Sequence, residues 1–133
     1  MARILLIVGG AINSLFFLFH IYLGFQLHRV TQLTSGQRGL LEAFNISGAL
    51  FILYFVVASW FMQSDLLGTV VGKTTLVLAA VLYLSRAGEE FVLFQGNLAI
   101  FASCLLTGLI YGALFIMAMR QRASAPVHHA AAA

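Results

Sequence analysis

Three side chains in this sequence bring acid–base residue types into otherwise apolar runs: His20, Arg86 and Glu90. Histidine exchanges protons near neutral pH, a carboxylate sheltered from water can take up a proton in the same range, and arginine can hold an oxyanion. A charge deep in a membrane costs on the order of 2.5 to 3.5 kcal/mol, so such residues are kept mainly for function or for pairing. Together they predict a catalytic acid–base site for an apolar substrate.

Helical spacing places further polar residues near these three. Tyr83, Arg86 and Glu90 share one helix face through their i+3 and i+4 spacing. His20 lies 16 residues beyond Ile4, about 24 Å along a helix, which is the outer third of a membrane. We therefore expect one polar layer, with Glu42 and Glu89 at its rim. The candidate ligand-binding residues are Asn13, Asn45, Tyr83, Glu89 and Tyr111.

A purely structural interpretation explains the same residues. Arg86 can form a local ion-pair cluster with Glu89 and Glu90, while His20 hydrogen-bonds across to Asn45 or to a backbone carbonyl. Both interpretations require helices that bring distant parts of the chain together.

The composition identifies those helices as membrane-spanning. The 133 residues are 62% hydrophobic and 8% charged, with a mean hydropathy of +1.01, whereas soluble domains are about 45 to 50% apolar and 25% charged. Apolar runs of roughly 20 residues match a hydrocarbon layer about 30 Å thick. We expect an all-α, polytopic four-transmembrane-helix bundle with short loops, one domain over residues 1–122, and a disordered tail over 123–133. The predicted spans are about 4–27, 43–63, 70–94 and 98–119.

The third span has two possible registers. A span over residues 66–85 would place Lys73 inside the membrane and leave "RAGEE" in a loop. A start near Val70 moves Lys73 to the interface and lets "FVLF" complete the span. The second register explains "FVLF" better, and it puts Arg86 and Glu90 in the outer part of the bilayer.

Small and polar residues mark the helix faces that meet other helices. On the first span Gly9, Asn13, His20 and Gly24 fall within a narrow arc. Gly108 and Gly112 form a G-x-x-x-G pair, which predicts either an internal helix contact or a seam between two copies.

Several other classes of site are excluded by spacing. His20 and His28 lie about 12 Å apart on one helix and cannot both bind one haem iron. Gly68 and Gly72 are one residue too close for a phosphate-binding P-loop, and the lone Cys104 offers no metal-ligand spacing. We therefore predict no cofactor, no metal and no nucleic-acid partner.

Two functions remain. The first is a membrane protein that binds a lipid-soluble small molecule or serves as an accessory subunit, with membrane lipids, a second copy or a membrane partner as its contacts. The alternative is an intramembrane isomerase, hydrolase or cyclase that uses the His20, Arg86 and Glu90 layer. Lysine and arginine flank the side of the termini slightly more often, which favours a bacterial inner membrane with both termini cytoplasmic.

Overall fold

The computed structural model describes residues 1–92 and 97–123, and this part of the chain forms five helices. Four of them are long and apolar enough to cross a membrane, which confirms the predicted all-α four-helix bundle. The disordered tail predicted over 123–133 falls almost wholly outside the described residues. The helices are α1 (Ala2–Arg29), α2 (Ser35–Phe61), α3 (Gln63–Gly68), α4 (Val70–Val92) and α5 (Leu98–Ala123).

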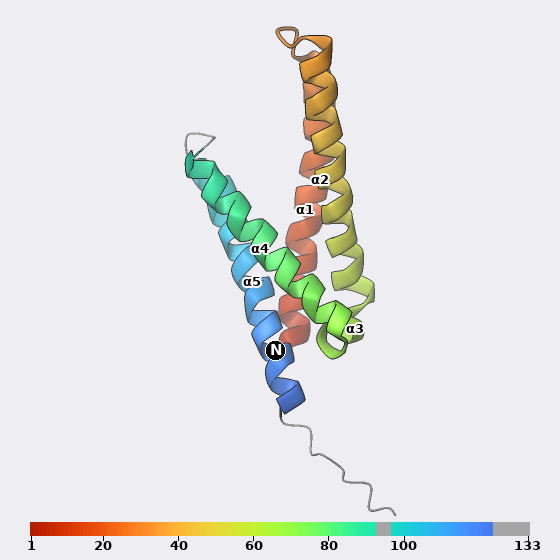
Figure 1. The fold of residues 1–133 in the computed structure, drawn as a ribbon, viewed down its shortest axis with the longest axis vertical. Coiled ribbons are helices and arrows are strands. Elements are labelled where there is room, and N and C mark those ends of the chain that lie inside the picture. The colour runs from red at the N-terminus through yellow and green to blue at the C-terminus, as the bar shows by residue number, and fades with distance from the viewer. Residues whose placement is uncertain (93–96, 124–133) are drawn as a thin grey trace, which may run out of the picture.

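The four long helices form two hairpins that cross. α1 packs along α2 and α4 packs along α5, while α1 also contacts α5. Figure 1 shows the hairpins close together at the end where the N-terminus lies and apart at their tips, with α4 passing across the first hairpin. The short helix α3 connects the two hairpins at the end where they are close together.

The helix boundaries follow from local chemistry. α2 begins at Ser35, well before residue 43, where the sequence placed the start of the second span. Thr34 and Gln37 form a capping box there, in which the backbone N–H of Gln37 donates to Thr34 Oγ1 at 3.3 Å. The Thr34 amide donates in return to Gln37 Oε1 at 3.0 Å, so two N–H groups at the helix start are satisfied. α4 begins at Val70, the start that the register with "FVLF" inside the span requires.

The core lies where the hairpins cross and is built from close packing. Leu6, Phe55, Leu76 and Leu114 are fully or almost fully buried and belong to one cluster. Several alanines lie on the packed side of α4 and α5. In lipid the hydrophobic effect does not hold helices together, so small residues that allow close approach carry more of the association. These alanines are Ala79, Ala80, Ala87 and Ala118.

The two glycines of the G-x-x-x-G pair have different surroundings. A methyl group at Gly108 would lie 2.8 Å from Leu84 Cγ and 3.2 Å from the Leu84 amide nitrogen, so Gly108 serves the contact between α4 and α5. Gly112 has no neighbouring atom within 4 Å of such a group among the described residues. Only the first glycine therefore makes the predicted internal contact.

Two backbones approach each other closely where α3 meets α4. A methyl group at Gly72 would overlap the Asp65 carbonyl oxygen and lie 2.5 Å from Leu66 Cα. Backbone atoms cannot rotate away as a side chain could, so this position requires glycine. Gly72 thus holds the connecting helix against the second hairpin.

We predict that Gly72→Ala will lower the free energy of unfolding by at least about 2 kcal/mol, because α3 must move away from α4. The measurement is unfolding of the detergent-solubilised protein by sodium dodecyl sulfate, followed by circular dichroism. Gly68→Ala is the matched control, since nothing lies within 4 Å of its added methyl group. Equal stability of the two variants would contradict the close contact.

Candidate functional site

Asn13 on α1 is a fully buried amide that connects all four spanning helices. Its Nδ2 donates to the Gly9 carbonyl at 2.9 Å and to the Tyr111 hydroxyl of α5 at 2.6 Å. Its Oδ1 accepts a hydrogen bond from the Tyr83 hydroxyl of α4. Ser59 of α2 completes the set through a 2.7 Å hydrogen bond to Tyr111. We call Asn13, Ser59, Tyr83 and Tyr111 the Asn13 cluster.

Aromatic rings pack closely around this cluster. Tyr83 and Tyr111 are stacked with ring centroids 6.4 Å apart, and Phe16 stacks on Tyr83 at 5.5 Å. Phe55 lies against both tyrosines, with centroids 6.3 and 6.2 Å away. The polar atoms are thus satisfied by one another and sheltered by rings. This arrangement suits a structural joint better than a site that must admit a ligand.

His20 and Asn45 form a second polar pair, between α1 and α2. Asn45 Nδ2 donates to the His20 carbonyl at 3.0 Å, and its Oδ1 lies 2.9 Å from His20 Nδ1. Because an amide oxygen can only accept, Nδ1 carries the hydrogen. Gly24 and Gly48 make room for the pair: a methyl group there would lie 3.3 Å from Asn45 Nδ2 and 3.1 Å from His20 Cε1, respectively.

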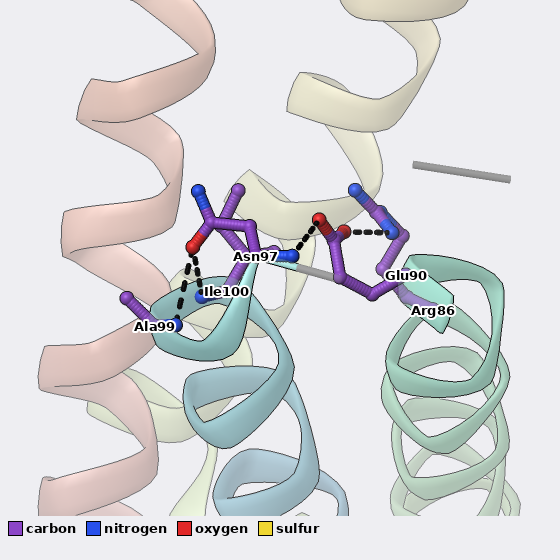
Figure 2. A network of polar contacts seen from close by, with 5 residues as sticks. All are labelled: Arg86, Glu90, Asn97, Ala99 and Ile100. Atoms are coloured by element: carbon purple, nitrogen blue, oxygen red, sulfur yellow. Dashed lines mark hydrogen bonds and ion pairs between the residues drawn. The ribbon is translucent and has the colours of Figure 1, made fainter. Parts of the chain in front are cut away.

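Arg86 and Glu90 form a third group, at the tip of the second hairpin. Arg86 Nη1 lies 2.8 Å from Glu90 Oε2, and the Glu90 side chain is only 2% exposed. Figure 2 shows the other carboxylate oxygen of Glu90 accepting from the Asn97 amide, at 3.1 Å. Asn97 Oδ1 in turn accepts from the amides of Ala99 and Ile100 at the start of α5. Glu90 therefore ties the end of α4 to the start of α5.

The candidate residues of the sequence, apart from Glu89, are divided among these three groups. His20 and Asn45 belong to the first hairpin, whereas Arg86 and Glu90 lie near the tip of the second, and the tips are apart in Figure 1. Glu89 is exposed on α4. The assembly of His20, Arg86 and Glu90 into one catalytic site stays a prediction, and their described contacts are local.

A small pocket lies near the tip of the first hairpin. Its volume is about 230 Å³, and its lining includes Gly24, Asn45, His28 and Glu42. His28 Nδ1 lies 3.3 Å from Glu42 Oε1, with the His28 side chain 66% exposed. An exposed ion pair of this kind contributes at most about 1 kcal/mol to stability.

A larger groove, which the sequence did not predict, lies between α2 and the first half of α4. Its volume is about 680 Å³, and it is lined by one face of α2 and by residues between Val70 and Leu78 of α4. Its walls are almost entirely apolar, with Leu50 and Phe51 on one side and Leu78 on the other. Ligand sites commonly have volumes of about 300 to 1,000 Å³ and apolar walls with a few polar groups.

The polar groups of this groove include two hydroxyls that meet across it. Tyr54 on α2 and Thr75 on α4 are hydrogen-bonded at 3.0 Å between their oxygens. Tyr54 is 44% exposed and Thr75 only 8% exposed, so the pair is reached from the side of the tyrosine. We call these two residues the hydroxyl pair.

The sequence alone indicates the two helix faces that line the groove, but not that they face each other. Ser47, Leu50, Phe51 and Tyr54 recur at i+3 and i+4 on α2, and a similar pattern with two threonines starts α4. Each pattern by itself also fits a lipid-facing stripe. Only the crossing of the hairpins, with α4 lying over α2, turns the two stripes into one groove.

Comparison with known proteins does not assign the chain to a family. No protein-family model matches the chain, and searches of curated proteins and of solved structures find no match. Among the described residues no group of three histidine, cysteine, aspartate or glutamate side chains could hold a metal ion. The groove and the polar groups are therefore the features from which a function can be inferred.

We predict that Tyr111→Phe will lower the free energy of unfolding by about 1 to 3 kcal/mol, because it leaves Asn13 and Ser59 without their shared partner in a buried site. Unfolding by sodium dodecyl sulfate in detergent micelles measures the change. Tyr22→Phe is the matched control, since Tyr22 is 58% exposed on α1. A loss no larger than that of the control would contradict the role of the Asn13 cluster.

Proposed function

We propose that this protein is a noncatalytic membrane component that holds a lipid-soluble molecule in the groove between α2 and α4. The groove is the observation that carries the proposal, because its volume and apolar walls fit such a molecule and it opens between two spanning helices. The hydroxyl pair supplies a fixed polar point that could orient the ligand. An accessory subunit that presents such a ligand to a membrane partner is included in this proposal.

The enzymatic alternative has less support from the geometry. Its acid–base residues lie in two pairs on different hairpins, and Glu90 is already bonded to Arg86 and to the backbone amide of Asn97. An enzyme would require a conformation that brings His20 to Arg86. A lipid product that disappears on His20→Ala would favour the enzyme over the binding protein.

We predict that a small apolar probe bearing a photoreactive diazirine will label the groove saturably in membranes. Leu78→Trp should reduce the saturable part, because the indole is larger than the leucine side chain and obstructs part of the groove. The measurement is mass spectrometry of labelled peptides at increasing probe concentration, with an unlabelled competitor. Lipid-facing positions of α5 should label in proportion to probe concentration without saturation.

Val81→Trp is the matched control for this experiment. Val81 lies on the same helix with 55% exposure, against 48% for Leu78, and it does not line the groove. Saturable labelling that survives Leu78→Trp as well as it survives Val81→Trp would exclude the groove as the binding site.

The distribution of charge supports an orientation with both termini in the cytoplasm of a bacterial inner membrane. The end that holds the termini carries four basic residues and one acidic residue, whereas the opposite end carries three of each. Lysine and arginine favour the cytoplasmic side, where anionic lipid headgroups attract them. The residues at the end with the termini are Arg3, Asp65, Lys73, Arg120 and Arg122.

We predict that a reporter fused after Arg122 will be active only in its cytoplasmic form, whereas a cysteine at Gln37 will react with an impermeant thiol reagent from outside intact cells. Cys104→Ser removes the native thiol beforehand. The α1–α2 turn and the end of α5 lie at opposite ends of the bundle. Finding both positions on one face of the membrane would contradict the four-span topology.

A further inference from the structure

The hydroxyl pair lines the groove, whereas the other two hydroxyls that bond to each other between spanning helices, those of Ser59 and Tyr111, are enclosed in the Asn13 cluster. Four serines and threonines of these helices bond to the carbonyl four residues earlier in their own helix, which satisfies them locally. Tyr54 and Thr75 instead bond to each other across the groove. The hydroxyls that bond to their own helix are those of Ser14, Ser47, Thr74 and Thr107.

A count of hydrogens leaves this pair with an unused donor. Two hydroxyls carry two hydrogens, and their mutual hydrogen bond uses one of them. Among the hydrogen bonds of the described residues, none takes the second hydrogen. A hydroxyl hydrogen that faces an apolar groove gains by meeting an acceptor, since leaving it unmatched in a low dielectric is costly.

The depth of the pair indicates where that acceptor comes from. Thr75 lies five residues beyond Val70, about 7 Å along α4, and Tyr54 lies seven residues before Phe61, about 10 Å from the end of α2. Both distances start at the helix ends on the side of the termini. Lys73, which we expect at the membrane interface, lies two residues before Thr75, about 3 Å along α4. We therefore place the hydroxyl pair close to the boundary between the headgroup region and the hydrocarbon, where the ester groups of glycerolipids lie.

The groove continues from the pair toward the middle of the membrane. Leu78 lies about 12 Å along α4 from Val70, and Ser47 lies about 21 Å along α2 from Phe61. An acyl chain that begins at the level of the hydroxyl pair would therefore follow Phe51, Leu50 and Leu78 inward. The ester carbonyl of a lipid would lie at the hydroxyl pair, and its acyl chain would lie against the apolar walls farther along the groove.

We infer that the hydroxyl pair donates a hydrogen bond to the ester carbonyl of an acyl lipid from the leaflet on the side of the termini, and that the acyl chain of this lipid occupies the groove. This inference rests on the proposed function, and it names the class of ligand. The lipid headgroup is not selected by the groove, because its lining carries no charged side chain.

The test compares two photoactivatable phosphatidylcholines that differ only in having ester-linked or ether-linked chains, each with a diazirine near the middle of one chain. The full-length protein is placed in vesicles of ether-linked phosphatidylcholine, so that the probe alone carries an ester. We expect the ester probe to label groove peptides about two- to tenfold more than the ether probe at limiting concentration, the range that one net hydrogen bond provides.

Variants assign the preference to the hydroxyl pair. Tyr54→Phe combined with Thr75→Val keeps the shape of the groove while removing both hydroxyls, and it should reduce the ester-to-ether ratio to about one. Ser47→Ala is the matched control, because its hydroxyl lines the same groove but is bonded to the Ala43 carbonyl at 2.9 Å. If the double variant is unstable, the ester-to-ether ratio is measured with Tyr54→Phe alone, which should also lower it.

Each outcome has one meaning. Saturable labelling of the groove by both probes to the same extent would overturn the ester inference and leave the proposed function in place. An ester preference that persists in the double variant would also overturn the inference, because the hydroxyl pair would not be its source. No saturable labelling by either probe, nor by the simple apolar diazirine, would overturn the proposed function and the inference with it.

Discussion

The structure depends on a single buried amide whose hydrogen bonds cannot be replaced by water. Asn13 lies deep in α1, where an unsatisfied amide would cost several kcal/mol, and it is satisfied only when α4 and α5 supply their tyrosine hydroxyls. Ser59 extends the network to α2. Hydrophobic burial does not drive helix association in lipid. The Asn13 cluster and the small residues around it therefore determine where the two hairpins cross.

The crossing point explains the groove. The hairpins are close together toward the end with the N-terminus and separate toward their tips (Figure 1), so α2 and α4 line one groove only over the part of their length where the hairpins are close. Two apolar stripes face each other there, and the hydrogen bond of the hydroxyl pair connects them. The site proposed for a lipid chain is therefore a geometric consequence of joining the two hairpins at one level.

Polar and charged residues away from the end with the N-terminus connect the two helices of each hairpin. Glu90 accepts a hydrogen bond from the backbone amide of Asn97, which precedes α5, and its charge is compensated by Arg86. His20 has a comparable role between α1 and α2, where Asn45 bonds to both its ring and its carbonyl. In each case the residue that looked suited to acid–base chemistry satisfies a backbone group or a neighbouring side chain.

The sequence by itself determined the four spans, because a composition of 62% hydrophobic residues in runs of membrane length permits few alternatives to a helical bundle. It also indicated the inward side of α1, since Gly9, Asn13, His20 and Gly24 share one stripe. It could not determine which polar residues meet, because helical periodicity gives the direction of a side chain but not the crossing of helices that are distant in the chain. The tertiary structure decided that Asn13 bonds to Tyr83 and Tyr111, that His20 bonds to Asn45, and that Arg86 pairs with Glu90. It also decided that two ordinary lipid-facing stripes form a groove, because the angle between the hairpins is set by packing at the joint.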